Sequence, residues 1–265
     1  MFETPPSTLF DEIQLRTFRE LHPKPAAFAE GEQTEGWEPI AWYAGGPASR
    51  PSIDKIQISG AINRTRLIAM QADPEICTLE LCVAILAWGG MNRGNRDHLF
   101  RQPVDAWIEV ASAIRAGELS RSQAFDAFAK LYHRKVIKGM KPAYFTKLIY
   151  FLMPRGGAPI GYIMDQWLGC SMNLLCGQEI VKMDHQLSWQ QKRGLEQPER
   201  SLSSSVSAWN TGRDYQHFCN AIEALALIMG PEWTPETTEL TLMSHGGHQP
   251  GAWRAHVKNE RLTRF

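Results

Sequence analysis

The stretch KGMKPAYFTKLIYFLMP, residues 138–154, decides the fold of this 265-residue chain. Pro142 suits the first turn of a helix, because the N–H group that proline lacks would have no partner there. The apolar run that follows ends at Met153, and only Thr146 and Lys147 interrupt it. The stretch therefore predicts a largely buried helix with one lysine embedded in it.

The residues before this helix predict a second one. Ser120 and Gln123 form a capping box, and apolar residues recur after it at helical spacing. The four residues KGMK, 138–141, then break the helical pattern. A helix, a tight turn and another helix make a helix-hairpin-helix, which we expect at about residues 120–153.

The turn of this motif has the chemistry of a phosphate-binding site. Backbone N–H groups at a helix N-terminus bind phosphate oxygens without reading the base sequence, and nearby lysines neutralise the phosphate charge. The predicted DNA-binding residues are Lys138, Gly139, Met140 and Lys141.

Charge is distributed unevenly along a chain whose net charge is zero. Residues 127–164 contain seven basic residues and no acidic one, whereas the first 40 residues contain eight acidic and three basic residues. A local basic stretch on a neutral protein predicts a focused anionic partner, here double-stranded DNA. A solvent-exposed helix face is the alternative interpretation.

The rest of the chain predicts an all-α fold. Residues 1–60 are rich in proline and glycine and predict an irregular N-terminal extension, followed by a helical domain over residues 61–265. Residues 186–210 are polar and weakly patterned, which predicts a long loop. Apolar periodicity predicts further helices over residues 78–91 (with Thr78 as N-cap), 103–117, 166–177, 213–230 and 234–243.

Composition argues against several classes of protein. Hydrophobic residues make up 43% and charged residues 21% of the chain, and no apolar run is long enough to span a bilayer. The acidic, proline-rich N-terminus is unlike a signal peptide. Five scattered cysteines without a CxxC pair argue against zinc and iron–sulfur sites. We therefore expect a cytoplasmic monomer with no cofactor, no metal and no membrane association.

Lys147 is the first candidate for chemistry. On a helix its neighbours three and four positions away are Ala143, Tyr144, Tyr150 and Phe151, which are apolar or aromatic. Apolar surroundings lower the pKa of an amine, and a neutral lysine is a nucleophile that forms Schiff bases. The alternative is a lysine that extends its amine to solvent.

Asp165 follows Lys147 by 18 residues (165 − 147) and stands where the next helix begins. An aspartate there is most simply an N-cap, whose side chain accepts hydrogen bonds from the first turn. A carboxylate held at a helix N-terminus stays ionised, so it can also support a positive charge that develops nearby. The two roles are compatible.

The hairpin, the embedded Lys147, the Gly/Pro-rich connection and Asp165 together resemble the helix-hairpin-helix DNA glycosylase superfamily. The sequences GMKPAYFTKLIYFL and YIMDQW are most similar to the bacterial family of 8-oxoguanine DNA glycosylase-like proteins, over roughly residues 60–245. This resemblance implies that DNA is bent at a cleft and that a damaged base is flipped out. It also implies that the lysine attacks the sugar C1′ and that the aspartate stabilises the oxocarbenium-like sugar.

Two features depart from the superfamily pattern. The hairpin has Lys141 where a second glycine is usual, and a gapless match places Ala143 at the usual lysine position. Lys141 is therefore a rival nucleophile, although the 18-residue spacing and the apolar surroundings favour Lys147. If neither lysine reaches C1′, the resemblance implies a monofunctional enzyme in which Asp165 activates water.

A flipped base needs aromatic side chains to stack on and polar side chains to read its edge. Among nine tryptophans, Trp88 and Trp167 are best placed, and Asn92 and Gln166 are candidates for the base edge. Core packing of the tryptophans and plain surface positions for the amides are the alternatives. The resemblance points to oxidised guanine; a hypermodified base, such as a glycosylated cytosine of phage DNA with a role in anti-phage defence, is also open.

The C-terminal segment contains His245, His248 and His256, but no carboxylate or cysteine completes a recognisable metal-ligand spacing. These histidines are therefore not predicted to bind a metal. We instead expect Arg254 and Lys258 of this segment to contact DNA.

The predicted function is a base-excision DNA glycosylase with lyase activity. One rival is a non-catalytic helix-hairpin-helix protein that senses distorted or modified DNA, and another is an all-α scaffold in which the hairpin only packs. Lys147 together with Asp165 favours the enzyme, because a binding module has no use for an amine in an apolar stripe.

Overall fold

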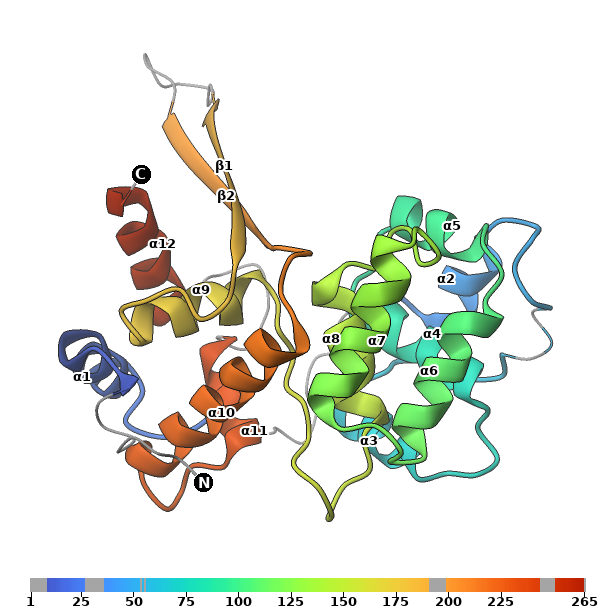
Figure 1. The fold of residues 1–265 in the computed structure, drawn as a ribbon, viewed down its shortest axis with the longest axis horizontal. Helices are drawn as coiled ribbons and strands as arrows, with labels where there is room; N and C mark the ends of the chain where they lie inside the picture. The colour runs from blue at the N-terminus through green and yellow to red at the C-terminus, as the bar shows by residue number, and fades with distance from the viewer. Residues whose placement is uncertain are drawn as a thin grey trace. The chain divides into compact units, whose positions relative to one another are not determined.

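The structure is a computed structural model that describes residues 9–26, 36–52, 54, 56–190, 199–243 and 251–264. Twelve helices and one two-stranded antiparallel sheet make up the regular structure of these residues (Figure 1). The prediction of a helical fold is confirmed, with one small sheet added to it. The chain forms two compact units: unit 1 is Met1–Ala27, Met164–Asn210 and His217–Phe265, and unit 2 is Phe28–Ile163 and Thr211–Gln216.

Seven helices belong to unit 2. They are α2 (Pro39–Ala44), α3 (Arg64–Gln71), α4 (Thr78–Trp88), α5 (Arg93–Phe100), α6 (Asp105–Arg115), α7 (Arg121–His133) and α8 (Pro142–Leu152). Helices α4 and α8 are apolar on nearly every face, so they pack against each other at the centre of the unit, and α3 and α6 pack against both.

Helix α8 is the buried helix that the sequence predicted. Its residues Leu148 and Phe151 are fully buried, and Phe145 stacks on Phe128 of α7 with 5.6 Å between ring centroids. The buried hydroxyl of Thr146 donates a hydrogen bond of 2.8 Å to the carbonyl oxygen of Pro142, so it has an acceptor inside the helix.

Helix α7 begins with the predicted capping box but ends at His133, four residues earlier than the pattern predicted. Lys135 adopts a left-handed backbone with φ +62°. Its N–H donates to Tyr132 O (2.9 Å), and the N–H of Val136 donates to Leu131 O (3.0 Å). These two bonds make a Schellman motif, which ends a helix. The motif was not foreseen because a lysine occupies the position where glycine is usual.

Unit 1 contains the remaining helices. They are α1 (Glu12–Leu21), α9 (Gln166–Leu175), α10 (Gly212–Met229), α11 (Pro235–Leu242) and α12 (Ala252–Arg264), of which α10 has its first residues in unit 2. The core of unit 1 includes Phe18, whose ring centroid lies 5.0 Å from that of Trp253 and 6.0 Å from that of Trp233. The indole N–H of Trp253 donates to Ser171 Oγ at 3.2 Å, which ties α12 to α9.

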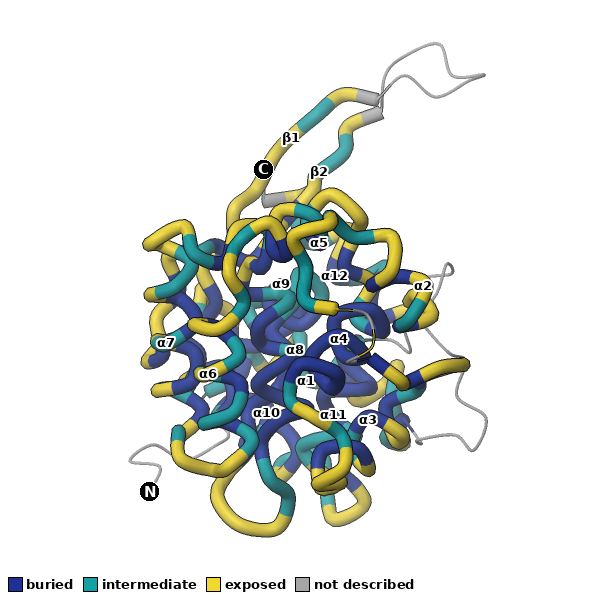
Figure 2. The backbone as a smooth tube through the Cα atoms, turned by 90° about the vertical axis from the view of Figure 1, so that its right-hand side faces the viewer, coloured by how far each residue is buried: buried dark blue, intermediate teal, exposed yellow. Residues whose placement is uncertain are grey.

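The prediction of a long loop over residues 186–210 is wrong, because most of the described residues in this range belong to a β-hairpin. Strand β1 (Met183–Gln190) pairs antiparallel with β2 (Glu199–Val206), and both contact α9. The outer part of the hairpin is largely exposed (Figure 2). Serine occupies four of the eight positions of β2, and Val206 is its one β-branched residue, so the strand lacks the composition that usually signals one.

Other elements also differ from expectation. Within residues 1–60, predicted to be irregular, α1 and α2 are helical, and α3, α5 and α12 were not predicted. Helix α4 has Cys77 as its N-cap residue in place of Thr78, with no side-chain cap hydrogen bond. These helices are short or strongly polar, so their apolar periodicity is weak over few turns.

Candidate nucleic-acid interface and active-site residues

The turn between α7 and α8 is shaped by Gly139 and Met140. Met140 is fully buried and its N–H donates to Ile137 O at 3.1 Å, which anchors the turn in unit 2. Gly139 has φ +88°, and a Cβ there would overlap the carbonyl oxygen of Asn95 and lie 2.9 Å from its Cα. A left-handed backbone packed this closely on α5 accepts glycine alone.

The same turn presents unused hydrogen-bond donors. Among the described residues, none accepts from the backbone N–H groups of Gly139, Lys141 and Ala143, whereas those of the next two residues both donate to Lys141 O. The side chains of Lys138 and Lys141 are exposed. Free N–H groups beside two exposed cations suit a phosphate group.

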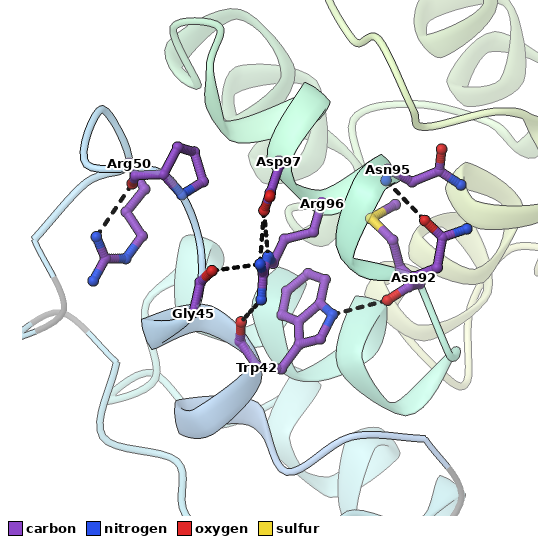
Figure 3. A network of polar contacts seen from close by, with 9 residues as sticks. Trp42, Gly45, Arg50, Asn92, Asn95, Arg96 and Asp97 are labelled. Carbon is purple, nitrogen blue, oxygen red and sulfur yellow. Dashed lines mark hydrogen bonds and ion pairs between the residues drawn. The ribbon is translucent and has the colours of Figure 1, made fainter.

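The first turn of α5, on which Gly139 packs, is fixed by a buried arginine (Figure 3). Arg96 is 4% exposed and donates to the carbonyl oxygens of Trp42 (2.6 Å) and Gly45. Its guanidinium also pairs with Asp97 at 2.7 Å. The two carbonyl oxygens belong to the last turn and the C-cap of α2, so the guanidinium holds α5 against the end of α2.

Asn92 is exposed at the start of α5. Its Oδ1 accepts from the N–H of Asn95 at 2.9 Å, which makes Asn92 the N-cap of the helix (Figure 3). Its amide NH₂ donates to no described residue. Asn92 therefore caps α5 and carries two amide N–H donors that no described residue uses.

Lys147 is half-buried on α8. Its Nζ donates a hydrogen bond of 2.7 Å to the carbonyl oxygen of Gly89, the residue that ends α4, and lies 5.7 Å from the ring centroid of Tyr144. The predicted partial desolvation is present, and the amine is directed to a backbone carbonyl. The end of α4 thus fixes where this amine lies.

Trp88 packs in the interior of unit 2. It is 7% exposed, and its ring meets that of Phe151 edge-on with 5.0 Å between centroids. The buried guanidinium of Arg64 lies 5.6 Å from the Trp88 ring and 4.9 Å from that of Tyr150. The side chain therefore stabilises the contact between α3, α4 and α8.

The segment from α8 toward Asp165 is held within unit 2 as far as Tyr162. Arg121 donates to Ile160 O at 2.9 Å, and the hydroxyl of Tyr215 donates to Tyr162 O at 2.7 Å. This Gly/Pro-rich connection is consequently anchored by side chains of α7 and α10.

Asp165 is the N-cap of α9, as predicted. Its Oδ1 accepts from the N–H groups of Trp167 (2.8 Å) and Leu168 (3.0 Å). Its Oδ2 accepts from no other described residue. The residue is half-buried, and the cap holds its carboxylate through one oxygen.

Gln166 and Trp167 lie beside each other at the start of α9. With its carboxamide oriented to satisfy both groups, Gln166 donates to Ser204 O (2.7 Å) and accepts from Trp167 Nε1 (3.3 Å). Three cations of α12 lie over the half-buried Trp167 ring: Arg254 is 4.3 Å, Lys258 5.4 Å and Arg261 5.7 Å from its centroid.

Arg261 is a candidate that sequence reasoning missed. The spacing 254, 258, 261 places all three cations on one helix face, and that signal depends on recognising residues 252–264 as a helix. Low mean hydropathy hid the helix, because eight of its thirteen residues are polar or charged.

The predicted site residues are divided between the two units. Unit 2 holds Lys147, the turn residues 138–141, Trp88 and Asn92, whereas unit 1 holds Asp165, Gln166 and Trp167.

Of the three C-terminal histidines, His256 pairs through Nε2 with Gln14 Oε1 at 2.8 Å, and His245 and His248 lie outside the described residues. The described part of the chain brings no three His, Cys, Asp or Glu side chains together as metal ligands. None of its helices combines the length and apolar character needed to cross a bilayer.

Comparison with known proteins gives one match. A family model described as "Putative 8-oxoguanine DNA glycosylase OGG-like protein" matches residues 29–243 of the chain. No curated protein and no solved structure matches it. The match contains every predicted site residue up to Trp167 and ends before α12.

Proposed function

Because this chain belongs to the family of OGG-like DNA glycosylases, we propose that it removes a modified base from double-stranded DNA and forms a Schiff base with the sugar. The turn between α7 and α8 binds phosphates through its free N–H groups and through Lys138 and Lys141. The modified base leaves the stack, since no protein group reaches its glycosidic bond inside a duplex.

Lys147 is the proposed nucleophile, and its half-buried amine at Gly89 is the observation that carries the proposal. For attack, the Lys147 ammonium loses one proton to solvent and breaks its hydrogen bond to the Gly89 carbonyl oxygen. The nitrogen lone pair then bonds to C1′ while the glycosidic bond breaks, and the bonding electrons leave with the base, which takes up a proton. Opening of the sugar ring converts the C1′ adduct to a Schiff base.

Asp165 is proposed to stabilise the positive charge on the sugar in the transition state. Two backbone N–H groups orient its carboxylate through Oδ1, and Oδ2, which accepts from no other described residue, is the oxygen proposed to face the charge. A preorganised charge of this kind acts on the chemical step more than on binding.

Asn92 and Trp88 of unit 2, and Gln166 and Trp167 of unit 1, are the residues proposed to contact or support the flipped base. Asn92 supports this with a free amide NH₂ that suits the acceptors of a base edge, and Trp167 supports it with a half-buried ring. For Trp88, whose ring is 7% exposed, the proposal is restricted to supporting the pocket wall.

The testing experiment is borohydride trapping on duplexes that each carry one modified base. The duplexes carry oxidised guanines, glycosylated cytosines, other modified pyrimidines or a preformed abasic site. We expect a covalent protein–DNA adduct with one class of modified base. Base release without an adduct would replace the lysine mechanism by attack of water activated by Asp165. DNA binding without base release from any duplex would reject the enzyme and favour the non-catalytic sensor of modified DNA.

A further inference from the structure

We propose that the β1–β2 hairpin and α12 form a second DNA-contacting surface, which binds one DNA strand beside the modified base. We call it the hairpin face, and its residues are Leu187, Trp189, Arg200, Leu202, Lys258 and Arg261. The proposal rests on the proposed function for the identity of its partner. The hairpin face itself is inferred from the strand register, the side-chain exposure and the charges of unit 1 alone.

Strand register places the hairpin residues on one face. Trp189 lies opposite Arg200 and Leu187 opposite Leu202, and residues two apart along a strand share a side. The root of this side, Met183 opposite Val206, is buried against the helices of unit 1. Farther out the same side is exposed: Leu187 is 44% and Trp189 66% accessible.

Contacts with α12 extend this side of the hairpin toward α9. Ser204, which lies on the same side, accepts a hydrogen bond of 3.0 Å from Arg261. Arg261 and Lys258 both lie over the ring of Trp167. Aromatic, aliphatic and basic side chains therefore share one side of unit 1, from Trp189 at the outer end of the hairpin to Trp167 at the start of α9.

Charge indicates the partner. Among the described residues, none forms an ion pair with Arg200, Lys258 or Arg261. The carboxylate of Asp184 lies on the opposite side of the hairpin, and Glu179 stands only at the root, where it lines a cavity of about 320 Å³. Exposed tryptophan interleaved with unpaired cations is the chemistry that stacks on bases and neutralises phosphates.

A second copy of this chain fits the hairpin face poorly. A two-fold contact places the same surface on both subunits, so the three cations would face three cations. Like charges brought together in this way cost energy unless a counterion intervenes. A DNA strand supplies the missing negative charge along the whole length of the surface.

The test uses the full-length protein with Trp189→Ala and Arg200→Ala. The matched controls are Gln186→Ala and Ser203→Ala, a directly opposed pair on the other side of the same hairpin. Fluorescence anisotropy measures Kd for a lesion duplex, and single-turnover base release is measured at saturating enzyme. Trp189→Ala should raise Kd about tenfold or more, as lost base stacking does. Trp189→Phe should restore most of the affinity, and Arg200→Ala should lower the salt slope by about one phosphate.

The outcomes separate the hairpin face from the glycosylase proposal. Saturated single-turnover rates should remain as in the unmodified protein, because Lys147 and Asp165 are untouched. Wild-type Kd for Trp189→Ala, or equal losses in the Gln186 and Ser203 controls, would overturn the hairpin face while base release continues. A concentration-dependent dimer in sedimentation that Trp189→Ala abolishes would overturn it in favour of self-association. Selective loss of DNA affinity without base release from any duplex would retain the hairpin face and reject the glycosylase.

Discussion

The amine of Lys147 is held 2.7 Å from the carbonyl oxygen of Gly89, so a residue of α8 takes its position from the end of α4. A Cβ on Gly89 would lie 2.8 Å from Lys147 Cδ and 3.3 Å from its Nζ. The space that Gly89 leaves is therefore filled by the lysine side chain. A Gly89→Ala substitution should therefore displace the Lys147 side chain without removing its amine.

Gly89→Ala should slow Schiff-base trapping by about 10²-fold, the effect of an ångström-scale displacement of a reacting group. Gly89 has φ −67°, which alanine adopts freely, so thermal stability should change little. Single-turnover trapping and calorimetry measure the two effects. Gly157→Ala is the matched control, because no atom lies within 4 Å of the added methyl group. A Gly89→Ala protein that traps at the normal rate would show that the position of Lys147 is irrelevant to the chemistry.

Lys147→Ala should abolish covalent trapping while DNA affinity stays within a few-fold of the starting protein. Lys141→Ala should retain trapping and weaken binding, because Lys141 is exposed beside the phosphate-binding turn. Trapping and anisotropy on the same duplex distinguish the two. Survival of the adduct in Lys147→Ala and its loss in Lys141→Ala would assign the nucleophile to Lys141.

Asp165→Asn should reduce base release by about 10²-fold or more, since the negative charge facing the sugar cation is lost. Asparagine keeps an oxygen for the N–H groups of Trp167 and Leu168, so the melting temperature should hardly move. Asp165→Ala removes the cap as well and should cost about 1 kcal/mol of folding free energy. Full activity in a folded Asp165→Asn protein would reject the catalytic role and leave only the cap.

Gly139→Ala should weaken DNA binding and destabilise the fold. A left-handed backbone costs a non-glycine residue about 1–2 kcal/mol, and the methyl group would also overlap the backbone of Asn95. Urea denaturation and anisotropy measure both losses. Gly156→Ala is the control for backbone strain alone, because it has φ +90° with open space around it. Equal losses of DNA affinity in both variants would exclude a specific role for the turn.

Lys135→Gly should stabilise the protein by about 0.5–1 kcal/mol, because φ +62° at the end of α7 strains a lysine and not a glycine. Lys138→Gly removes the same charge from the same turn at a position without a positive φ, so it should destabilise. Urea denaturation compares the two. Destabilisation by both substitutions would contradict the Schellman motif as the end of α7.

Sequence patterns predicted the elements whose signals are local. Three such signals each act within one turn of helix: the capping box before α7, Pro142 at the start of α8 and Asp165 as the cap of α9. Each could therefore be predicted without knowledge of tertiary contacts. The half-burial of Lys147 followed from its aromatic neighbours for the same reason.

Features that depend on distant contacts were not predictable. The acceptor of Lys147 is 58 residues away, and the cations around Trp167 come from a helix about 90 residues later. The hairpin was missed although Met183, His185, Leu187 and Trp189 alternate in β1, because its partner strand carries serines. A strand pair is visible in a sequence only when both strands carry the pattern.

The serines of β2 have a consequence for aggregation. Each strand of a two-stranded sheet is an edge, with a row of backbone groups open to pairing with another chain. Ser201, Ser203 and Ser205 keep the side of β2 opposite the hairpin face polar, which disfavours the dry, interdigitated stacking of amyloid-like sheets. Replacing these serines with valines would strengthen the strand and at the same time create a template for intermolecular strand addition. The serines therefore lower the intrinsic strand propensity of β2 and at the same time disfavour pairing of the hairpin with another chain.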